Sequence, residues 1–193
     1  MRCGCCLRNG GDSVIYCTMY SAPDFADLTL ASDGEAIVGL WLEGQKYFGG
    51  TVVEEMQRDD GLAAFKPVRD WLDAYFAGDD PELDSLLLRP NGSKFRQRVW
   101  QKLKEIPLGQ LRAYGDIGRE LAAEDGKDTF SAQAVGGAVG HNPISIIIPC
   151  HRVVSSNGSL TGYAGGIDKK IWLLEHEGAM SDKLFVPTKG TAL

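Results

Sequence analysis

The chain has 193 residues, with 20 Lys and Arg against 26 Asp and Glu, and a formal net charge of −6 at pH 7. With 44% hydrophobic and 24% charged residues, it is neither disordered nor collagen-like, and its length suits one or two compact domains. No apolar run approaches the roughly 20 residues that cross a bilayer, and no secretory signal is apparent, so we expect no membrane association. The net acidity by itself disfavours nucleic acid as a partner, because cations supply most of the non-specific affinity for phosphates.

The charge is unevenly distributed along the chain. Residues 1–92 hold 7 basic and 16 acidic side chains, whereas residues 93–178 hold 11 basic and 9 acidic ones. This asymmetry indicates two bodies with different partners, although an acidic domain also gains solubility in this way. The sequence therefore leaves a DNA partner open for the second half alone.

The first half predicts a small α/β domain over residues 13–76. Three β-prone runs predict strands, and the last two flank a hairpin turn of Asp-Gly type; the runs cover residues 14–19, 28–31 and 36–42. Helical spacing over 62–76 predicts a helix that bends or restarts at Pro67. Residues 1–12 are expected to be an irregular Cys-rich lead-in, and the composition of residues 77–92 predicts a linker.

The second half predicts a mostly helical domain over residues 93–178, followed by a tail over 179–193. Ser93 can cap a first helix, and two further helices over 114–122 and 131–140 are typical of a helix-turn-helix. Beyond them we expect a buried strand, Ile144 to Ile148, and a last helix that Asp168 caps and that runs through Glu177, as the apolar pattern indicates.

The helix over 131–140 is rich in small residues, namely Ala132, Ala134, Gly136, Gly137, Ala138 and Gly140. Each glycine destabilises a helix by about 1 kcal/mol relative to alanine. A helix that is thin, because its side chains are this small, therefore needs an explanation. Either a neighbouring helix or an external partner approaches its backbone closely.

Four of the five cysteines crowd the N-terminus, at positions 3, 5, 6 and 17, and the fifth is Cys150. This is a poor disulfide framework, so we expect a reducing compartment, the cytoplasm. Cys150 directly precedes His151, and a neighbouring base makes a thiol a better nucleophile. The two can cooperate only if the backbone turns after Pro149 or a water bridges them, because neighbours in a strand point to opposite faces. A structural buried cysteine is the alternative.

Glu177 favours the catalytic interpretation. A carboxylate in the last turn of a helix lies at the negative end of the helix dipole, which destabilises it by about 0.3–1 kcal/mol. Glu177 therefore needs another partner, and a histidine that must be oriented is a candidate. Cysteine, histidine and carboxylate would then form a triad. Exposure on a frayed helix end is the alternative.

The segment Pro149-Cys150-His151-Arg152-Val153-Val154 resembles the active-site signature of the O6-alkylguanine-DNA alkyltransferases, the methylated-DNA–protein-cysteine methyltransferases. Further motifs are similar in the family's order: Ala134-Val135-Gly136-Gly137-Ala138, Asn142-Pro143, Gly162-Tyr163-Ala164-Gly165-Gly166 and Trp172-Leu173-Leu174-Glu175-His176-Glu177-Gly178. The resemblance implies an α/β (α+β) fold class, with an N-terminal ribonuclease H-like α/β domain and a mostly helical C-terminal domain that contains a helix-turn-helix.

The resemblance also implies a role for each matched residue. Cys150 would take the alkyl group from O6-alkylguanine, and from O4-alkylthymine, in a base flipped out of duplex DNA, irreversibly and once per molecule. His151 would act as base through a water, Glu177 would orient it, Asn142 would hold the turn, and Tyr114 would help to rotate the base and protonate the leaving guanine. Substrate binding would fall to the Cys150 carbonyl and to Val153, Tyr163, Ala164 and Gly165, and DNA binding to Ala132, Gln133, Ala134, Gly136, Gly137 and Arg152.

The same resemblance implies no cofactor, no metal and no obligate protein partner, and a monomer that binds double-stranded DNA. Two positions depart from the family's pattern. Gln133 stands where many members carry an arginine that fills the gap left by the flipped base, and Ala164 stands where a serine is frequent.

Three other interpretations compete with alkyl transfer. A non-enzymatic lesion binder of the same fold would lack the nucleophile that Cys150 provides. A thiol hydrolase built on Cys150 and His151 would need an oxyanion hole, for which the sequence gives no sign. A zinc module of Cys3, Cys5, Cys6 and Cys17 would have unsuitable ligand spacing.

Overall fold

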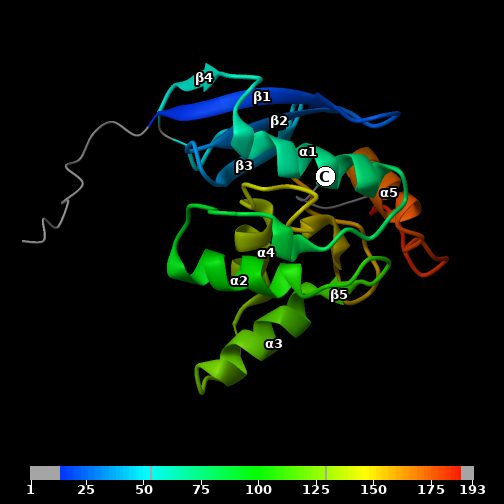
Figure 1. The fold of residues 1–193 in the computed structure, drawn as a ribbon. Coiled ribbons are helices and arrows are strands. Elements are labelled where there is room, and N and C mark those ends of the chain that lie inside the picture. The colour runs from blue at the N-terminus through cyan, green and yellow to red at the C-terminus, as the bar shows by residue number, and fades with distance from the viewer. Residues whose placement is uncertain (1–13, 53, 129, 188–193) are drawn as a thin grey trace, which may run out of the picture.

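The computed structural model describes residues 14–52, 54–128 and 130–187 (Figure 1). Its first half contains a sheet with the strand order β3-β2-β1-β4, namely β1 (Ile15–Ser21), β2 (Asp27–Ser32), β3 (Ile37–Leu42) and β4 (Met56–Arg58). Strands β1 to β3 pair antiparallel, and β4 pairs parallel with β1. The predicted hairpin joins β2 to β3, and Gly34 lies there with a φ of +99°, which favours glycine.

Helix α1 (Lys66–Phe76) follows the short 3-10 turn η1 (Ala63–Phe65). Pro67 lies in the first turn of α1, where the backbone N–H has no partner within the helix and its absence costs nothing. Of the two predicted outcomes, a bend or a restart, the structure shows the restart. One face of α1 is buried in the same core as strands β2 and β3, and that face carries Tyr75. In this way α1 directs a phenol toward the second half of the chain.

The outer edge of β3 holds two segments that are distant in sequence. Residues 77–92 contain the 3-10 turn η2 (Leu83–Ser85), and Ile37 exchanges backbone hydrogen bonds of 2.8 Å with Leu87 and Arg89. Further along β3, the backbone of Leu40 bonds in the same way to Pro143 and Ser145, over 2.8 and 2.9 Å. The segment that leads to Cys150 is therefore fastened to the sheet.

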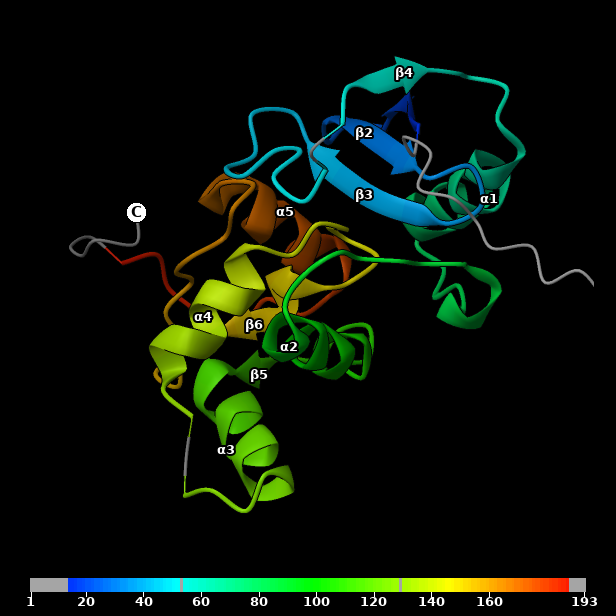
Figure 2. The same ribbon diagram turned by 90° about the vertical axis from the view of Figure 1, so that its left-hand side faces the viewer.

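The second half contains four helices, α2 (Lys94–Lys104), α3 (Tyr114–Glu124), α4 (Ala132–Gly140) and α5 (Ile167–His176). Helices α2, α3 and α4 pack together away from the four-stranded sheet, as Figure 2 shows. The hydroxyls of Ser93 and Ser131 accept from the backbone N–H three residues on and cap α2 and α4. A parallel pair, β5 (Arg112–Ala113) and β6 (Val153–Val154), links the start of α3 to the segment after Cys150.

One predicted strand and one predicted helix cap were wrong. Residues 144–148 are buried but form turns, with only Ile144 bridged to β3, and Ile146 adopts a φ of +68° that is uncommon for a β-branched residue. Helix α5 begins one residue before Asp168, after Gly166, whose φ of +95° suits glycine; Asp168 lies in the first turn and does not cap the helix. Apolar content predicted burial correctly in the first case, but it carries no information on chain reversal.

The hydrophobic core continues from the sheet into the helical half, and Leu40, Tyr75, Val99 and Cys150 belong to the same cluster. No helix within the described ranges is long and apolar enough to span a membrane. Cys3, Cys5 and Cys6 of the zinc alternative lie outside the described residues.

Candidate active site

The turn that Cys150 and His151 require is present. The 3-10 turn η3 (Cys150–Arg152) follows Pro149 directly, and the backbone N–H of Arg152 donates to the Pro149 carbonyl over 3.0 Å. Cys150 is 5% exposed and His151 is fully buried. Both residues therefore lie inside the protein, close to the seam between its halves.

Asn142 lies directly beside the Cys150 sulfur. Its Nδ2 donates to Sγ over 3.1 Å and to the Ile148 carbonyl over 2.7 Å, while its Oδ1 accepts from the backbone N–H of Ile144 over 3.1 Å. One buried side chain thus fixes both ends of the turn segment 144–148. These contacts require the chain to fold back, which accounts for the strained backbone of Ile146.

His151 is paired with Glu177, the residue that directly follows α5. His151 Nε2 lies 2.7 Å from Glu177 Oε1, and both side chains are fully buried. With a proton on Nε2, the Nδ1 atom carries a free lone pair, and Nδ1 has no hydrogen-bond partner in the described part of the chain. The pair is therefore arranged as an imidazole that can accept a proton at Nδ1 while Glu177 stabilises the resulting cation.

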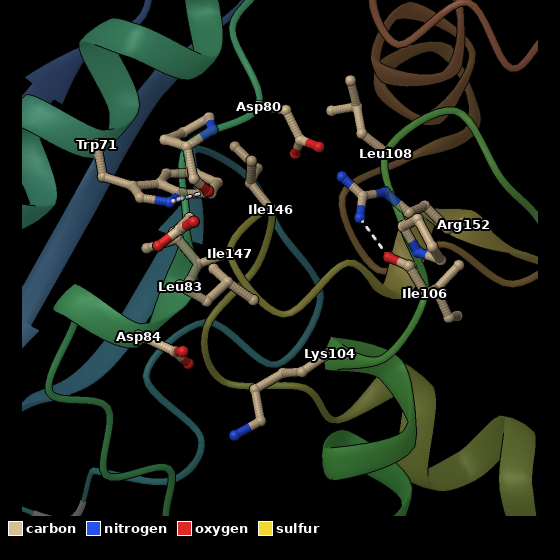
Figure 3. A pocket seen from close by; sticks show the side chains of 13 residues that line it. Trp71, Asp80, Leu83, Asp84, Lys104, Ile106, Leu108, Ile146, Ile147 and Arg152 are labelled. Carbon is tan, nitrogen blue, oxygen red and sulfur yellow. Dashed lines mark hydrogen bonds between the residues drawn. The ribbon is translucent and has the colours of Figure 1, made fainter.

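Arg152 also binds Glu177, contrary to the predicted contact with DNA. Its Nε and Nη2 donate to the two carboxylate oxygens over 2.8 and 3.0 Å. Its Nη1 donates to the Ile106 carbonyl over 2.6 Å, the bond drawn in Figure 3. The residue is 8% exposed. We therefore reassign Arg152 from DNA contact to a buried ion pair, because its donors are engaged inside the protein.

Burial sets the protonation states of the two reactive groups. It raises the pKa of the Cys150 thiol, against the opposing effects of the Asn142 hydrogen bond and the positive charge of Lys170. It lowers the pKa of His151, although the Glu177 carboxylate acts in the opposite direction. The resting protein therefore holds a neutral thiol and a neutral imidazole.

Lys170 is a site residue that sequence reasoning missed. It is fully buried, and its Nζ donates to the carbonyls of Val153 and Thr161 over 2.6 and 3.3 Å. Burial lowers its pKa to about 8, while the negative charge of a Cys150 thiolate favours its protonated form. The available signal was its place three and four residues before Leu173 and Leu174, on the buried face of α5.

The residues predicted to bind the base lie around this group. Tyr163 packs edge-on against the His151 ring, with 6.4 Å between ring centroids, and its hydroxyl is buried without a hydrogen-bond partner among the described residues. A Cβ on Gly165 would approach the Tyr163 ring to 2.7 Å, which explains the glycine. The carbonyl of Ala164 accepts from the backbone N–H of Lys46 over 2.9 Å, so the sheet half also holds this loop.

The predicted carbonyl acceptors and Tyr114 are also nearby. The Cys150 carbonyl already accepts the N–H of Val153, and the Val153 carbonyl accepts Lys170, so each has one lone pair left. The Tyr114 hydroxyl donates to the Thr161 carbonyl over 3.2 Å, and burial raises its pKa, with a further contribution from the negative charge of a Cys150 thiolate. Tyr114 is therefore a protonated donor at neutral pH.

Arg152 also lines a cavity of about 380 Å³ (Figure 3). Its lining includes Trp71, Asp80, Lys104 and Ile106, but none of the residues that surround the Cys150 sulfur. It is therefore distinct from the space that an alkylated base would need.

The exposed side of α4 carries the small residues singled out in the sequence. Ala132, Gln133, Ala134 and Gly137 are exposed, and Gly136 is half-buried. A Cβ at Gly137 would meet nothing within 4 Å, so internal packing does not explain this glycine. The exposed side of α4 is therefore open to close approach by a molecule outside the chain.

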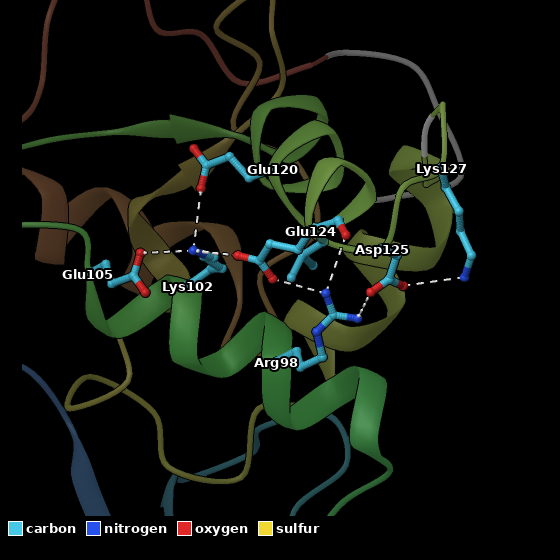
Figure 4. Close-up of polar contacts among 8 residues, drawn as sticks. Arg98, Lys102, Glu105, Glu120, Glu124, Asp125 and Lys127 are labelled. Carbon is cyan, nitrogen blue, oxygen red and sulfur yellow. Dashed lines mark hydrogen bonds and ion pairs between the residues drawn. The ribbon is translucent and has the colours of Figure 1, made fainter.

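Two cations of α2, the helix that packs against α4, are paired with acidic side chains. Arg98 lies 2.9 Å from both Glu124 and Asp125, and Lys102 contacts Glu105, Glu120 and Glu124, so these charges join α2 to α3 (Figure 4). Helix α4 itself contains no charged residue. Arg98 and Lys102 are therefore held by acidic side chains of the same half of the chain.

Comparison with known proteins identifies the family. Residues 94–179 match the DNA-binding domain of 6-O-methylguanine DNA methyltransferase, and residues 15–90 match the ribonuclease-like domain of the same family. The chain belongs to the 6-O-methylguanine DNA methyltransferase family. The predicted combination of a ribonuclease-like domain and a helical DNA-binding domain is confirmed.

Individual relatives agree with this assignment. A methylated-DNA–protein-cysteine methyltransferase of Haemophilus influenzae is 37% identical over 165 residues, which cover 86% of this chain and 87% of the relative. One of Mycobacterium tuberculosis (strain ATCC 25618 / H37Rv) is 45% identical over 150 residues, covering 78% and 85%. The crystal structure of M. tuberculosis O6-methylguanine methyltransferase matches with a TM-score of 0.71 at 39% identity, over 91% of this chain and 97% of that one. The crystal structure of M. tuberculosis OGT in complex with DNA matches with a TM-score of 0.69 at 39% identity, over 88% of this chain and 96% of that one.

Proposed function

We propose that this chain repairs duplex DNA directly by transferring the alkyl group of O6-alkylguanine to its own Cys150. The observation that carries the proposal is the contact of the Cys150 sulfur with the Asn142 amide, next to a fully buried His151–Glu177 pair. Membership of a methyltransferase family supplies the reaction class, and Cys150 is the cysteine with this environment among the described residues.

Each group has a defined part in the transfer. The thiol proton moves through a water to Nδ1 of His151, and Glu177 stabilises the imidazolium that forms. The Cys150 sulfur then attacks the alkyl carbon, so that an S–C bond forms as the bond from carbon to guanine O6 breaks. Tyr114 gives a proton to the leaving guanine and is reprotonated through solvent by the imidazolium. The products are unmodified guanine and an S-alkylcysteine.

The reaction has one turnover because no group at the site can cleave the thioether. The alkyl donor is the damaged base itself, so the chemistry needs no cofactor. The same displacement applies to O4-alkylthymine, in which the alkyl group also sits on an exocyclic oxygen. A lesion binder would not need the proton acceptor that Cys150 has in His151, and a hydrolase would turn over repeatedly.

Helix α4 is the proposed DNA-binding element. Its exposed small residues let the backbone approach the minor groove, and the target base is flipped out of the stack toward Cys150. Gln133 lies on that exposed side and would face the unpaired partner base with hydrogen-bonding groups but no charge. No second copy of the chain is needed for this arrangement, and we propose that it acts as a monomer.

Intact-mass measurement tests the function. After incubation with duplex DNA that contains O6-methylguanine, we expect the protein to gain the mass of one methylene group, with transfer stopping at one equivalent. Cys150→Ser should abolish the gain, whereas Cys17→Ser, which changes a half-buried free thiol in β1, should not. Repeated turnover, or transfer that survives Cys150→Ser, would contradict the mechanism.

A further inference from the structure

Tyr75, a residue of the sheet half of the protein, contacts the His151–Glu177 pair beside Cys150. Its hydroxyl, at the end of α1, donates to Glu177 Oε1 over 2.8 Å, and the residue is 1% exposed. The same oxygen atom accepts from His151 Nε2 over 2.7 Å. A phenol from the ribonuclease-like half and the imidazole next to the nucleophile therefore share one acceptor atom.

We infer that Tyr75 is a positioning residue for alkyl transfer, through which the ribonuclease-like half sets the orientation and basicity of the His151–Glu177 pair. This inference rests on the proposed function. It assigns to the first half of the chain a direct part in the chemistry, beyond supporting the fold of the second half.

The position of the Tyr75 hydroxyl is well fixed. The Tyr75 ring stacks on Trp71, one turn earlier in α1, with ring centroids 5.4 Å apart and an interplanar angle of 8°. The backbone carbonyl of Tyr75 accepts from His176 Nε2 over 2.8 Å. Tyr75 thus contacts two consecutive residues at the end of α5, His176 through its backbone and Glu177 through its side chain. These contacts hold the carboxylate in place relative to α1.

The charges around His151 make the effect of this hydroxyl predictable. The imidazole is influenced by Glu177, by the cations Arg152 and Lys170, and by the ring of Tyr163, and it adjoins Cys150 in η3. The cations and burial disfavour an imidazolium, and Glu177 favours it. By donating to Oε1, the Tyr75 hydroxyl reduces the electron density that Glu177 offers to His151. Loss of this donor should therefore make His151 more basic.

Tyr75→Phe tests the inference, with Tyr20→Phe as a matched control. Tyr20 lies in β1, and its hydroxyl also donates to a carboxylate, Asp73 Oδ1, over 2.8 Å. Both tyrosines lie in the first half of the protein, and each substitution removes one hydrogen bond from a hydroxyl to a carboxylate. Only Tyr75 contacts Glu177. Because Glu177 keeps its other donors, Tyr75→Phe should still fold.

The first readout is ¹⁵N NMR of the imidazole groups, which is tractable because the chain has only 3 histidines. In Tyr75→Phe we expect the pKa of His151 to rise by about half a unit and its Nε2–H proton to move downfield, as the bond to Glu177 strengthens. Tyr20→Phe should change neither. An unchanged His151 signal in Tyr75→Phe would overturn the inference, and this measurement needs no substrate.

The second readout is the rate of alkyl transfer in a single turnover as a function of pH. A more basic His151 becomes protonated at a higher pH. The acidic limb of the rate profile should therefore shift to higher pH in Tyr75→Phe, by the same amount as the His151 pKa, and stay in place in Tyr20→Phe. A uniform loss of rate with an unshifted limb would indicate a structural role only and refute the inference. If the wild-type protein transfers no alkyl group, the proposed function fails, while the NMR result still decides whether Tyr75 acts on His151.

Discussion

The amide nitrogen of Asn142 lies 3.1 Å from the sulfur of Cys150 and donates to the Ile148 carbonyl at the same time. A donor held in this way favours the thiolate over the thiol, because hydrogen bonds to the charged form stabilise it. It also fixes the direction in which the sulfur points. Asn142 therefore couples the shape of the turn to the reactivity of the nucleophile.

Asn142→Ala should slow alkyl transfer at least tenfold and lower the free energy of unfolding by about 1–3 kcal/mol, because buried backbone groups lose their partner. Single-turnover rates and urea unfolding measure the two effects. Asn157→Ala is the control, since Asn157 also bonds a backbone N–H, that of Ser159, but does so in a loop away from the sulfur. Equal rates for the wild type and Asn142→Ala would remove the amide from the mechanism.

Lys170→Met should slow transfer below pH 8, because the cation that lowers the pKa of the Cys150 thiol is gone. Lys170 itself has a pKa of about 8 and loses its charge above that pH. The ratio of the wild-type rate to the Lys170→Met rate should therefore fall toward one as the pH rises through 8. Lys169→Met is the control, because Nζ of Lys169 donates to the Glu43 carbonyl over 2.7 Å. A ratio independent of pH would contradict this role.

The same lysine should affect stability with a defined sign. Its pKa is lower in the folded protein than the ordinary 10.5, so the unfolded chain binds more protons between about pH 8 and 10.5. The free energy of unfolding should consequently rise with pH in that window for the wild type. Lys170→Met should lack this rise, which urea unfolding at several pH values would show.

Gly137→Ala should separate stability from DNA binding. A Cβ at Gly137 meets nothing in the protein, so alanine should stabilise α4 by about 0.5–1 kcal/mol. If the exposed side of α4 lies against DNA, the same methyl group should weaken DNA binding. Thermal unfolding and fluorescence anisotropy with a lesion-containing duplex give the two values. Higher stability with unchanged affinity would place the DNA elsewhere.

DNA binding should depend only weakly on salt, because α4 is uncharged and two cations of α2, Arg98 and Lys102, are paired with acidic residues. The slope of log affinity against log salt should therefore be shallow. Gln133→Arg adds one cation on the exposed side of α4 and should raise the affinity and steepen the slope by about 0.9. Anisotropy titrations at several salt concentrations measure both. A steep slope for the wild type would show that the pairing does not persist on DNA.

Part of the site followed from local pattern. A cysteine next to a histidine after an apolar run, with a carboxylate misplaced at a helix end, predicted the group that the structure brings together as Cys150, His151 and Glu177. These features are visible because each residue is anomalous in its own neighbourhood. The hairpin of the sheet, the Ser93 cap and the helical pair α3 and α4 were predictable for the same reason.

Other features depended on contacts that no local pattern records. Tyr75 is an ordinary apolar-face residue of α1 until α5 brings Glu177 to it, and Lys170 is an ordinary helix lysine until Val153 and Thr161 enclose it. The predicted strand at residues 144–148 failed because Asn142 binds both ends of that segment, which a hydrophobicity pattern cannot express.

The net charge of −6 disfavoured DNA as a partner, and this was misleading because a sum over the sequence does not record which charges face each other in the folded chain. The sequence by itself determined that Cys150, the proposed nucleophile, has a histidine directly beside it and that the first half is acidic, since these are properties of residue type and order. Only the tertiary structure decided that Arg152 is buried on Glu177, that Arg98 and Lys102 of α2 are paired with acidic residues, and that α4 exposes a thin uncharged side. Charge and chemistry belong to the residues, but whether they are available to a partner is set by what the folded chain places against them.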